Sequence, residues 1–589
     1  MKYTHVWNKL TSDMGYWVDT QNPYITYQSK YMESVWSILS KLYDKNLIYK
    51  GYTIQPFSPA AGTGLSTHEL NQPGCYKMIT DTSAIALFEL IPSSIKFVKL
   101  KQINSPIFAL AWTTTPWTLP SNTALCVGEN IQYSLVETFN QYDGKNIIII
   151  IAKNLINKQL VGKYFQTSDV KEFQNYKHLN KKIPFRVLFD FKGKDIVGVK
   201  YKQLLNYAKP YKGCENAFRI ISGDFVTTED GTGIVHIAPT FGSDDSIVAK
   251  KFNIPSLLVM NKNNQPIPIV NLQGKFISGM GDLSGMYVKN EFYEKNNRPK
   301  KSVDVIIIIN LKVQSKLFYS QKYEHSYPHC WRTDKPILYY PLDSWFIKTT
   351  EYKNKLITLN DSINWKPNST GVGRFKNWLE NLNDWNLSRS RFWGIPIPIW
   401  STKDESERIC IGSIEELYNE CEKSLKYGIM KHNPLKDFIV GDFSDINYSK
   451  IDLHKNYVDK IILCSSDFKP MYRENDLVDV WFDSGAMPYA QHHYPFENKN
   501  LIDENKNFPA DFIAEGVDQT RGWFFTLHVI STMCFNSVAF KNVISNGLVL
   551  DKNGSKMSKR LGNSIDPFLT ISKYCLLYTS DAADEGLGV

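Results

Sequence analysis

Hydrophobic and polar positions recur along this chain with two different periods, which divide it into helical and β-rich regions. Residues 24–49 carry aromatic and aliphatic side chains at helical spacing, among them Trp36 and Leu39, and predict an amphipathic helix. Residues 51–67 contain Pro and Gly and predict a loop. From about 83 to 287, short β-rich runs are separated by Gly, Asn and Pro, which predicts a β-barrel-like module. The clearest of these runs are 107–112, 147–152, 185–191 and 232–237.

The remaining segments follow a mixed pattern. Residues 288–324 are rich in Lys and Asn and weakly patterned, so they predict a variable excursion, and the aliphatic run 305–309 within them is typical of a buried strand. Farther on, 512–515 and 543–550 predict strands, and 519–532 predicts a helix that opens directly after a loop. Strand, loop and helix in that order fit a doubly wound α/β sheet, in which ligands bind beyond the carboxyl ends of the strands. We therefore expect an α/β nucleotide-binding domain interrupted by a β-rich insertion.

Composition narrows the class of protein. With 589 residues, of which 43% are apolar, the chain is long enough for roughly two to four domains. No apolar run approaches the ~18 to 20 residues of a membrane span, and the start of the chain has no signal-peptide pattern. Nine cysteines without a CxxC pair argue for a reducing compartment, so we expect a cytoplasmic protein without a disulfide framework. The net charge of +9 is compatible with a nucleic-acid partner but does not require one.

The most informative polar segment is a basic loop, Lys556-Met557-Ser558-Lys559-Arg560, which follows the run Asn546–Leu550 and a turn at Gly554. A Gly-containing loop lets the backbone approach a polyphosphate. Lys556 and Lys559 are mobile charges that can follow the negative charge on a departing pyrophosphate. Taken alone, a basic run of this kind is more often solvated surface.

The basic loop resembles the KMSKS signature of class I aminoacyl-tRNA synthetases, with Arg560 in place of the final Ser. Three upstream blocks, 384–398, 479–485 and 508–524, are similar in sequence and order to segments of isoleucyl-tRNA synthetases. Residues 487–498 are most similar to the eukaryotic cytosolic type of isoleucyl enzyme. The resemblance implies an α/β fold, a class I Rossmann-like catalytic domain interrupted by a β-barrel-like editing domain.

The resemblance also implies a synthetic site. Its members are Glu515, Gly516, Asp518 and Gln519 at the adenylate, Lys556 and Lys559 at the phosphates of ATP, and Trp481 and Trp523 at the isoleucine side chain. A carboxylate suits the ammonium group of the amino acid, a second carboxylate suits ribose hydroxyls, and a glycine allows close backbone approach. The alternatives are that Glu515 and Asp518 only cap the following helix, and that the two tryptophans are ordinary core residues.

A second site is implied by two segments, Trp112–Asn122 and Gly231–Asp245, which resemble the hydrolytic site of the editing domain in isoleucyl, valyl and leucyl enzymes. The candidate editing residues are Thr113, Thr114, Thr115, Thr118, Asn122, His236 and Asp245. The hydroxyls would orient a water and the ester end of a misacylated tRNA, and Asp245 would anchor the free amino group. A Thr-rich β-edge with satisfied hydroxyls is the alternative. Isoleucine and valine differ by one methylene, which discriminates by only ~1 to 3 kcal/mol, a magnitude established for the isoleucyl enzymes themselves.

The chain departs from the family pattern at three places. No HIGH motif occurs, and residues 575–589 do not continue the family sequence, so we expect an internal fragment that is inactive in synthesis and lacks the anticodon-binding domain. Bacterial-type members hold zinc with two CxxC pairs. The matching segments here, 58–63 and 329–334, retain only Cys330, so we expect no metal site.

These observations give an expected division of the chain and an expected function. The expected parts are 1–82, the remainder of the first catalytic half; 83–324, the inserted editing domain; 325–384, a return connective segment; 385–574, the second Rossmann half; and 575–589, a non-family tail. The expected activity is that of an isoleucine-tRNA ligase, with ATP and Mg²⁺ as cofactors, isoleucine and tRNA(Ile) as partners, and hydrolysis of Val-tRNA(Ile). A valyl enzyme and a deacylase-only or tRNA-binding protein are the alternatives. Membership of a multi-synthetase complex stays open.

Overall fold

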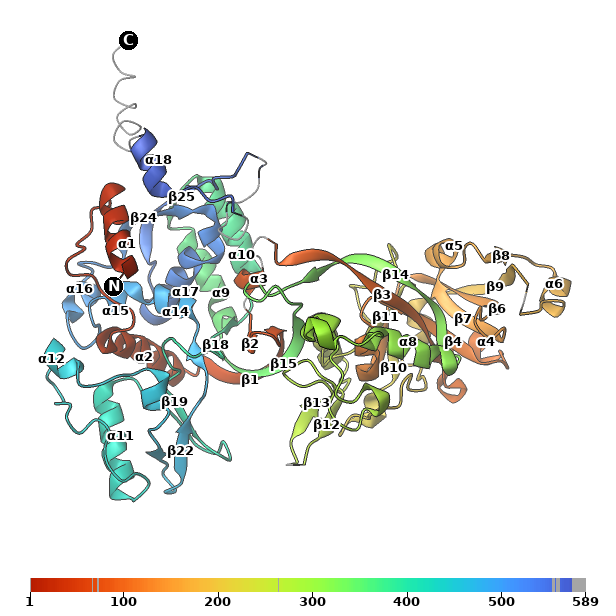
Figure 1. Ribbon diagram of the computed structural model, residues 1–589, viewed down its shortest axis with the longest axis horizontal. Helices are drawn as coiled ribbons and strands as arrows, with labels where there is room; N and C mark the ends of the chain where they lie inside the picture. Colours follow the sequence, from red (N-terminus) through yellow and green to blue (C-terminus); the bar gives the residue numbers. More distant parts are fainter. Residues whose placement is uncertain are drawn as a thin grey trace, which may run out of the picture. The chain divides into compact units, whose positions relative to one another are not determined.

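The chain divides into two compact units in its computed structural model, which describes residues 2–65, 67–70, 74–178, 180–262, 264–552, 554, 557 and 562–574. Unit 1 comprises residues 1–51 together with those from 344 onward, and unit 2 comprises 52–343. The chain leaves unit 1 within β1 (Ile48–Ser58) and returns within β15 (Leu338–Ile347) (Figure 1). The expectation of a loop over 51–67 is wrong over its first part, because β1 continues to Ser58. Unit 2, residues 52–343, begins before and ends after the expected insertion of 83–324.

Unit 2 is built on a ten-stranded sheet of mixed pairing. Its order is β10-β5-β11-β4-β7-β6-β9-β8, with β3 beside β4 and β14 beside β3. The strands are β3 (Tyr76–Glu89), β4 (Ile107–Thr113), β5 (Ala124–Val127), β6 (Gln132–Phe139), β7 (Asn146–Ala152), β8 (Tyr164–Gln166), β9 (Ile183–Lys192), β10 (Arg219–Ser222), β11 (Ile234–Ile237) and β14 (Leu317–Pro328). All four runs that predicted strands fall on this sheet. The isoleucines 147–151 of β7 are all buried, as expected for a central strand covered on both faces.

The aliphatic run 305–309 is not a strand but part of helix α8 (Val303–Val313). Ser302 is the N-cap, and its hydroxyl accepts a hydrogen bond from the Val305 N–H. Ile307, Ile308 and Leu311 are buried at helical spacing, and α8 packs against β3 and β14. The five-residue run carried a strand-like composition, but the cap before it and the buried positions beyond it favour a helix of three turns.

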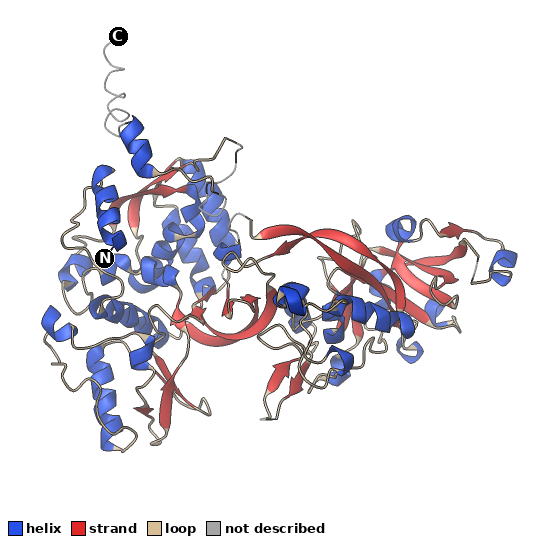
Figure 2. Ribbon diagram, viewed as in Figure 1, coloured by secondary structure: helices blue, strands red, loops and turns tan. Residues whose placement is uncertain are grey.

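Unit 1 contains a parallel sheet in the order β16-β25-β24, formed by β16 (Asn364–Lys366), β25 (Phe540–Asn546) and β24 (Ala510–Gly516). The crossover from β24 to β25 runs through the 3₁₀ helix η11 (Val517–Arg521) and helix α17 (Trp523–Phe535), which is buried almost all round. The strand expected over 543–550 ends at Asn546. Figure 2 shows more helix than strand in unit 1 and more strand than helix in unit 2. The α/β class is confirmed.

A buried cluster of hydrogen-bonded polar side chains joins separate parts of unit 1. Glu33, on helix α2 (Ser29–Asp44), accepts hydrogen bonds from the Ile414 N–H at 2.7 Å and from the Tyr448 hydroxyl at 2.7 Å. Nε2 of His493 lies 2.8 Å from the same carboxylate, and its Nδ1 lies 2.8 Å from Glu497. Each ring nitrogen therefore faces a carboxylate oxygen. Glu33 and His493 are both more than nine-tenths buried.

The described residues contain neither a membrane-spanning helix nor a cluster of metal-binding side chains. No helix there is both long enough and apolar enough to cross a membrane. In that same part of the chain, no three His, Cys, Asp or Glu side chains are grouped so that they could hold a metal ion.

Candidate active sites

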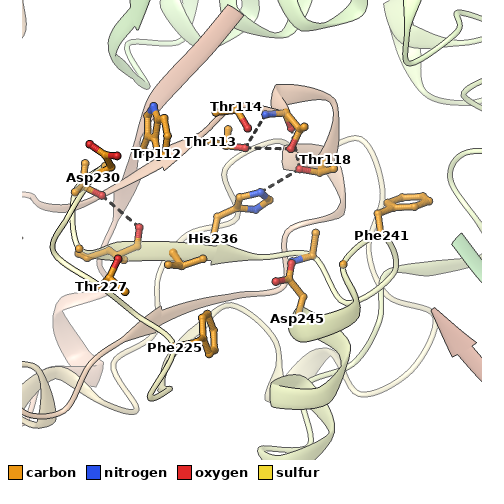
Figure 3. A pocket seen from close by; sticks show the side chains of 18 residues that line it. Trp112, Thr113, Thr114, Thr118, Phe225, Thr227, Asp230, His236, Phe241 and Asp245 are labelled. Atoms are coloured by element: carbon orange, nitrogen blue, oxygen red, sulfur yellow. Dashed lines mark hydrogen bonds between the residues drawn. The ribbon is translucent and has the colours of Figure 1, made fainter. Parts of the chain in front are cut away.

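A cavity of about 420 Å³ opens in unit 2 where β4 and β11 end (Figure 3). The two strands pair in parallel, with Val235 opposite Trp112. This register brings the Thr-rich segment after β4 beside His236 on β11. The lining residues are Trp112, Thr113, Thr114, Thr115, Thr118, Phe225, Thr227, Asp230, Gly231, Thr232, Gly233, Ile234, Val235, His236, Ala238, Phe241, Gly242 and Asp245.

The threonines of this cavity form an internally bonded turn. The Thr115 N–H donates to the Thr113 hydroxyl at 3.0 Å, and the hydroxyls of these two residues lie 3.3 Å apart. The 3₁₀ helix η2 (Pro116–Ser121) follows, and the Thr118 hydroxyl donates to the Thr115 carbonyl at 2.8 Å. These bonds fix the directions of the hydroxyls before any ligand enters, so the cavity wall is preorganised.

The Thr118 hydroxyl also lies 3.0 Å from Nε2 of His236. Because the hydroxyl has a single proton, which goes to the Thr115 carbonyl, we infer that Nε2 carries the imidazole proton and donates to Thr118. Burial lowers the pKa of His236 to about 4, so the ring is neutral at pH 7. Nδ1 is buried and has no hydrogen-bond partner among the described residues. The imidazole therefore keeps one unused lone pair.

Asp245, on helix α7 (Ser243–Lys251), supplies a buried carboxylate to the cavity. Its Oδ2 accepts the Ala238 N–H at 2.8 Å. Burial raises the pKa of Asp245 to about 6, which the Ala238 N–H opposes and the neighbouring Asp244 reinforces. A Cβ atom at Gly242 would lie 2.7 Å from the Asp245 carboxyl carbon, so the glycine allows the carboxylate to lie across the backbone. Above pH 6 Asp245 adds a negative charge to the cavity, which suits a cation.

A glycine-rich loop completes the wall. Gly231 and Gly233 have φ angles of 75° and 74°, which other residues seldom adopt. A Cβ at Gly233 would lie 2.4 Å from that of Ala152, and one at Gly231 would lie 3.0 Å from the ring of Trp112. Either substitution would push the loop out of the cavity wall.

Six of the seven candidate editing residues line the cavity, and Asn122 does not. The Asn122 amide donates to the Ala124 carbonyl at 2.8 Å and accepts from the Tyr201 hydroxyl at 2.6 Å. Its polar atoms are therefore bonded within the protein and do not face the cavity. Four further lining residues were not foreseen from sequence: Phe225, Thr227, Asp230 and Phe241. Of these four, only Phe241 lies within one of the two family-like segments, Gly231–Asp245, so only its position could have indicated a place in the cavity.

The residues expected at the adenylate lie where β24 ends in unit 1. Glu515 and Gly516 pair with Ser545 and Asn546 of β25, and the Glu515 side chain is exposed. A Cβ at Gly516 would lie 2.7 Å from Oδ1 of Asp518, so the Asp518 carboxylate folds back over this glycine.

The first backbone N–H of α17 is satisfied by Gln519 rather than by an acidic residue. Oε1 of Gln519 accepts the Trp523 N–H at 2.8 Å. Gln519 therefore caps α17 at this N–H.

The two tryptophans of the expected amino-acid pocket lie on contacting helices. Trp481 is on α14 (Val480–Gly485) and Trp523 begins α17, and both are half-buried. The Trp523 indole donates to the Ser484 carbonyl at 3.1 Å. A Cβ at Gly522 would lie 3.1 Å from the Trp481 ring, so this glycine permits their close approach. Lys556 and Lys559 lie outside the described residues.

Comparison with known proteins supports a family assignment. The model of the family "tRNA synthetases class I (I, L, M and V)" matches residues 1–580. An isoleucine–tRNA ligase of Bacteroides fragilis YCH46 is 57% identical over 592 residues, 98% of this chain and 51% of the relative. One of Clostridium tetani is 42% identical over 567 residues, 96% of this chain and 46% of the relative. The chain thus spans about half the length of these relatives.

A solved structure described as the ternary complex of Agrobacterium radiobacter K84 LeuRS with tRNA and LeuAMS covers 97% of this chain and 58% of that chain, with 15% identity and a TM-score of 0.35. The relatives named above are bacterial, so they give no support to the expected eukaryotic cytosolic type. The match over residues 1–580 includes both units and both candidate sites, and the chain belongs to the class I tRNA synthetase family.

Proposed function

We propose that this chain belongs to an isoleucine–tRNA ligase, which joins isoleucine to tRNA(Ile) with ATP, and that it carries the activity that removes valine from Val-tRNA(Ile). The relatives at 57% and 42% identity that bear this name support the proposal. The observation that carries the hydrolytic part is the cavity in which Thr118, His236 and Asp245 meet. Discrimination between isoleucine and valine by one methylene needs a second site of this kind.

The proposed hydrolysis uses the polar groups of the cavity in separate roles. Asp245 pairs with the ammonium of the esterified valine, because an ionised carboxylate in a partly desolvated site binds a cation strongly. Neutral His236 orients the Thr118 hydroxyl through its Nε2–H, and the bonded threonines hold the ester and the attacking water in place. Both effects depend on groups already fixed by internal hydrogen bonds, so little reorganisation precedes the reaction.

The proposed synthetic site lies in unit 1. Trp481 and Trp523 would enclose the isoleucine side chain, and Gly516, Asp518 and Gln519 would contact the adenosine. Glu515 is an exposed carboxylate, which fits an ammonium group. ATP would bring Mg²⁺, and carboxylate and phosphate oxygens are the ligands that this ion prefers. Lys556 and Lys559 are proposed at the phosphates. The scattered cysteines support a reducing compartment such as the cytoplasm.

Deacylation of purified misacylated tRNAs by residues 1–589 tests the hydrolytic proposal. Val-tRNA(Ile) should be hydrolysed faster than in buffer, and Ile-tRNA(Ile) should not. Preferential hydrolysis of Thr-tRNA(Val) would instead favour the valyl alternative. Isoleucine-dependent exchange between ATP and pyrophosphate, measured on the same preparation, tests the separate expectation that this chain is inactive in synthesis; exchange above background would contradict that expectation.

A further inference from the structure

A buried carboxylate outside the cavity is bonded to the backbone of its Thr-rich wall. Asp304, in the first turn of α8, accepts the Trp117 N–H at 2.8 Å through its Oδ1. Trp117 lies in η2, between Pro116 and Thr118. Asp304 is 5% exposed and Trp117 is 3% exposed. A bond between residues 187 positions apart thus ties α8 to the turn that carries Thr118.

The Trp117 N–H needs this partner. Helix η2 begins with Pro116, which has no N–H, and the first backbone bond of the turn is the one from the Thr118 N–H to the Thr115 carbonyl at 3.0 Å. The Trp117 N–H therefore comes too early in the helix to find an intrahelical acceptor. A buried N–H without an acceptor costs about 1 to 3 kcal/mol. Asp304 removes that cost only when η2 sits in its observed position.

The charged groups around Asp304 come from β3 and from residues 289–291. Burial raises the pKa of Asp304 to about 7; Lys289 opposes this, and Asp81 and Glu291 add to it. Lys289 bonds Asp81 at 2.6 Å and lies over the ring of Tyr327. Protonation of Asp304 would still leave its carbonyl oxygen as an acceptor. The bond to Trp117 is thus available to the acid, to the carboxylate and to an amide of the same shape.

The position of η2 decides the contacts of the cavity on two sides. Thr118 follows Trp117 directly and bonds His236 at 3.0 Å. The Trp117 ring packs on Phe241, another lining residue, with ring centroids 5.2 Å apart. A shift of η2 would therefore move the Thr118 hydroxyl and one apolar wall together. A displacement of about 1 Å in an active site can lower a rate on the order of 100-fold.

We propose that Asp304 is a positioning residue of the hydrolytic site, which holds η2 so that Thr118 can accept the His236 N–H. The inference rests on the proposed deacylation of Val-tRNA. Asp304 does not line the cavity and acts through Trp117 and Thr118. It lies in the segment 288–324 that composition presents as a variable excursion.

A double-mutant cycle on the full chain tests this role. Single-turnover deacylation of Val-tRNA(Ile) is measured for wild type, Asp304→Ala, Thr118→Val and the double variant. We expect Asp304→Ala to lower the rate constant about 10- to 100-fold with KM changed less than about 3-fold. The double variant should be no more than about 3-fold slower than the slower single variant, because both changes break one path. Asp304→Asn keeps an acceptor and should stay within about 3-fold of wild type.

A matched control removes a comparable bond elsewhere in unit 2. The buried Thr138 hydroxyl donates to the Pro184 carbonyl at 3.0 Å, and Thr138→Val should leave deacylation unchanged. If Asp304→Ala does not fold, Asp304→Ser replaces it, since its side chain is too short to reach Trp117. Two results would overturn the positioning role alone, provided that the wild-type chain deacylates Val-tRNA(Ile). One is an Asp304→Ala variant with the wild-type rate. The other is a double variant whose loss of rate equals the product of the two single losses. A wild-type chain without deacylase activity would overturn the proposed function as well.

Discussion

The hydroxyl of Thr118 lies 3.0 Å from Nε2 of His236 while donating its own proton to the Thr115 carbonyl. This arrangement fixes the tautomer of a buried, neutral imidazole whose pKa is lowered to about 4 by burial. A serine hydroxyl could make the same two bonds, whereas a valine could make neither.

Thr118→Val should therefore lower Val-tRNA deacylation about 5- to 100-fold, because the buried His236 N–H would lose its acceptor at a cost of about 1 to 3 kcal/mol. Thr118→Ser should recover most of the rate. The pair is read by single-turnover hydrolysis of labelled Val-tRNA(Ile). Equal rates for the valine and serine variants would show that the Thr118–His236 hydrogen bond does not contribute to deacylation.

Deacylation should have a bell-shaped dependence on pH. Asp245 must be ionised to pair with the ammonium of the substrate, so kcat/KM should rise as pH increases through about 6, the pKa to which burial raises this carboxyl. The α-amino group loses its proton near pH ~7.7 to 8, so the rate should fall again above that value. Asp245→Asn should lose the acidic limb. A limb near pH 6 that persists in this variant would belong to another group.

Asp245→Asn should also make unit 2 more stable at pH 8. The folded pKa of Asp245, about 6, exceeds the unfolded value of 3.8. A raised pKa means that the native state holds the proton more tightly. The contribution of Asp245 to the free energy of unfolding is therefore most favourable below pH 3.8 and is lost as pH rises through 6. Removing the ionised carboxylate should recover about 1 to 3 kcal/mol at pH 8 and almost nothing at pH 3.5. Thermal melting of both proteins at the two pH values checks the sign, and an Asn variant that melts lower at pH 8 would contradict it.

Glu33 should matter to the stability of unit 1. Glu33→Gln keeps an acceptor for the Ile414 N–H but removes the charge that faces Nε2 of His493. The amide N–H₂ of the glutamine cannot accept the hydrogen bond that one carboxylate oxygen receives, and a buried polar group left without its partner costs about 1 to 3 kcal/mol. We expect the melting transition of unit 1 to move down by several degrees, with deacylation in unit 2 little changed. Glu497→Gln, which alters the more exposed partner of His493, should cost less.

Six of the seven candidate editing residues, which were predicted from resemblance, line one cavity because they fall in two continuous segments. The register that pairs Val235 with Trp112 then brings those segments together. Asn122 shows the limit of this reasoning, since it belongs to the same segment yet bonds Ala124 and Tyr201 instead of lining the cavity.

Asp304 could not be foreseen, because its partner is 187 positions away and its segment carries no motif. The strand-like run 305–309 misled for a related reason. Its composition favours a strand, and only the Ser302 cap and the helix–sheet packing of α8 decide for a helix. The synthetic site was predicted from resemblance, and Lys556 and Lys559 remain predictions because they lie outside the described residues.

The most direct measurement of the central claim is hydrolysis of Val-tRNA(Ile) by residues 1–589 carrying Asp245→Ala. Loss of the carboxylate leaves the substrate ammonium unpaired in a partly desolvated cavity, which should cost about 2 to 4 kcal/mol of transition-state binding. The account predicts a fall in kcat/KM on the order of 30- to 1000-fold relative to wild type. A rate equal to that of wild type would show that the cavity formed by Thr118, His236 and Asp245 is not where the ester is hydrolysed.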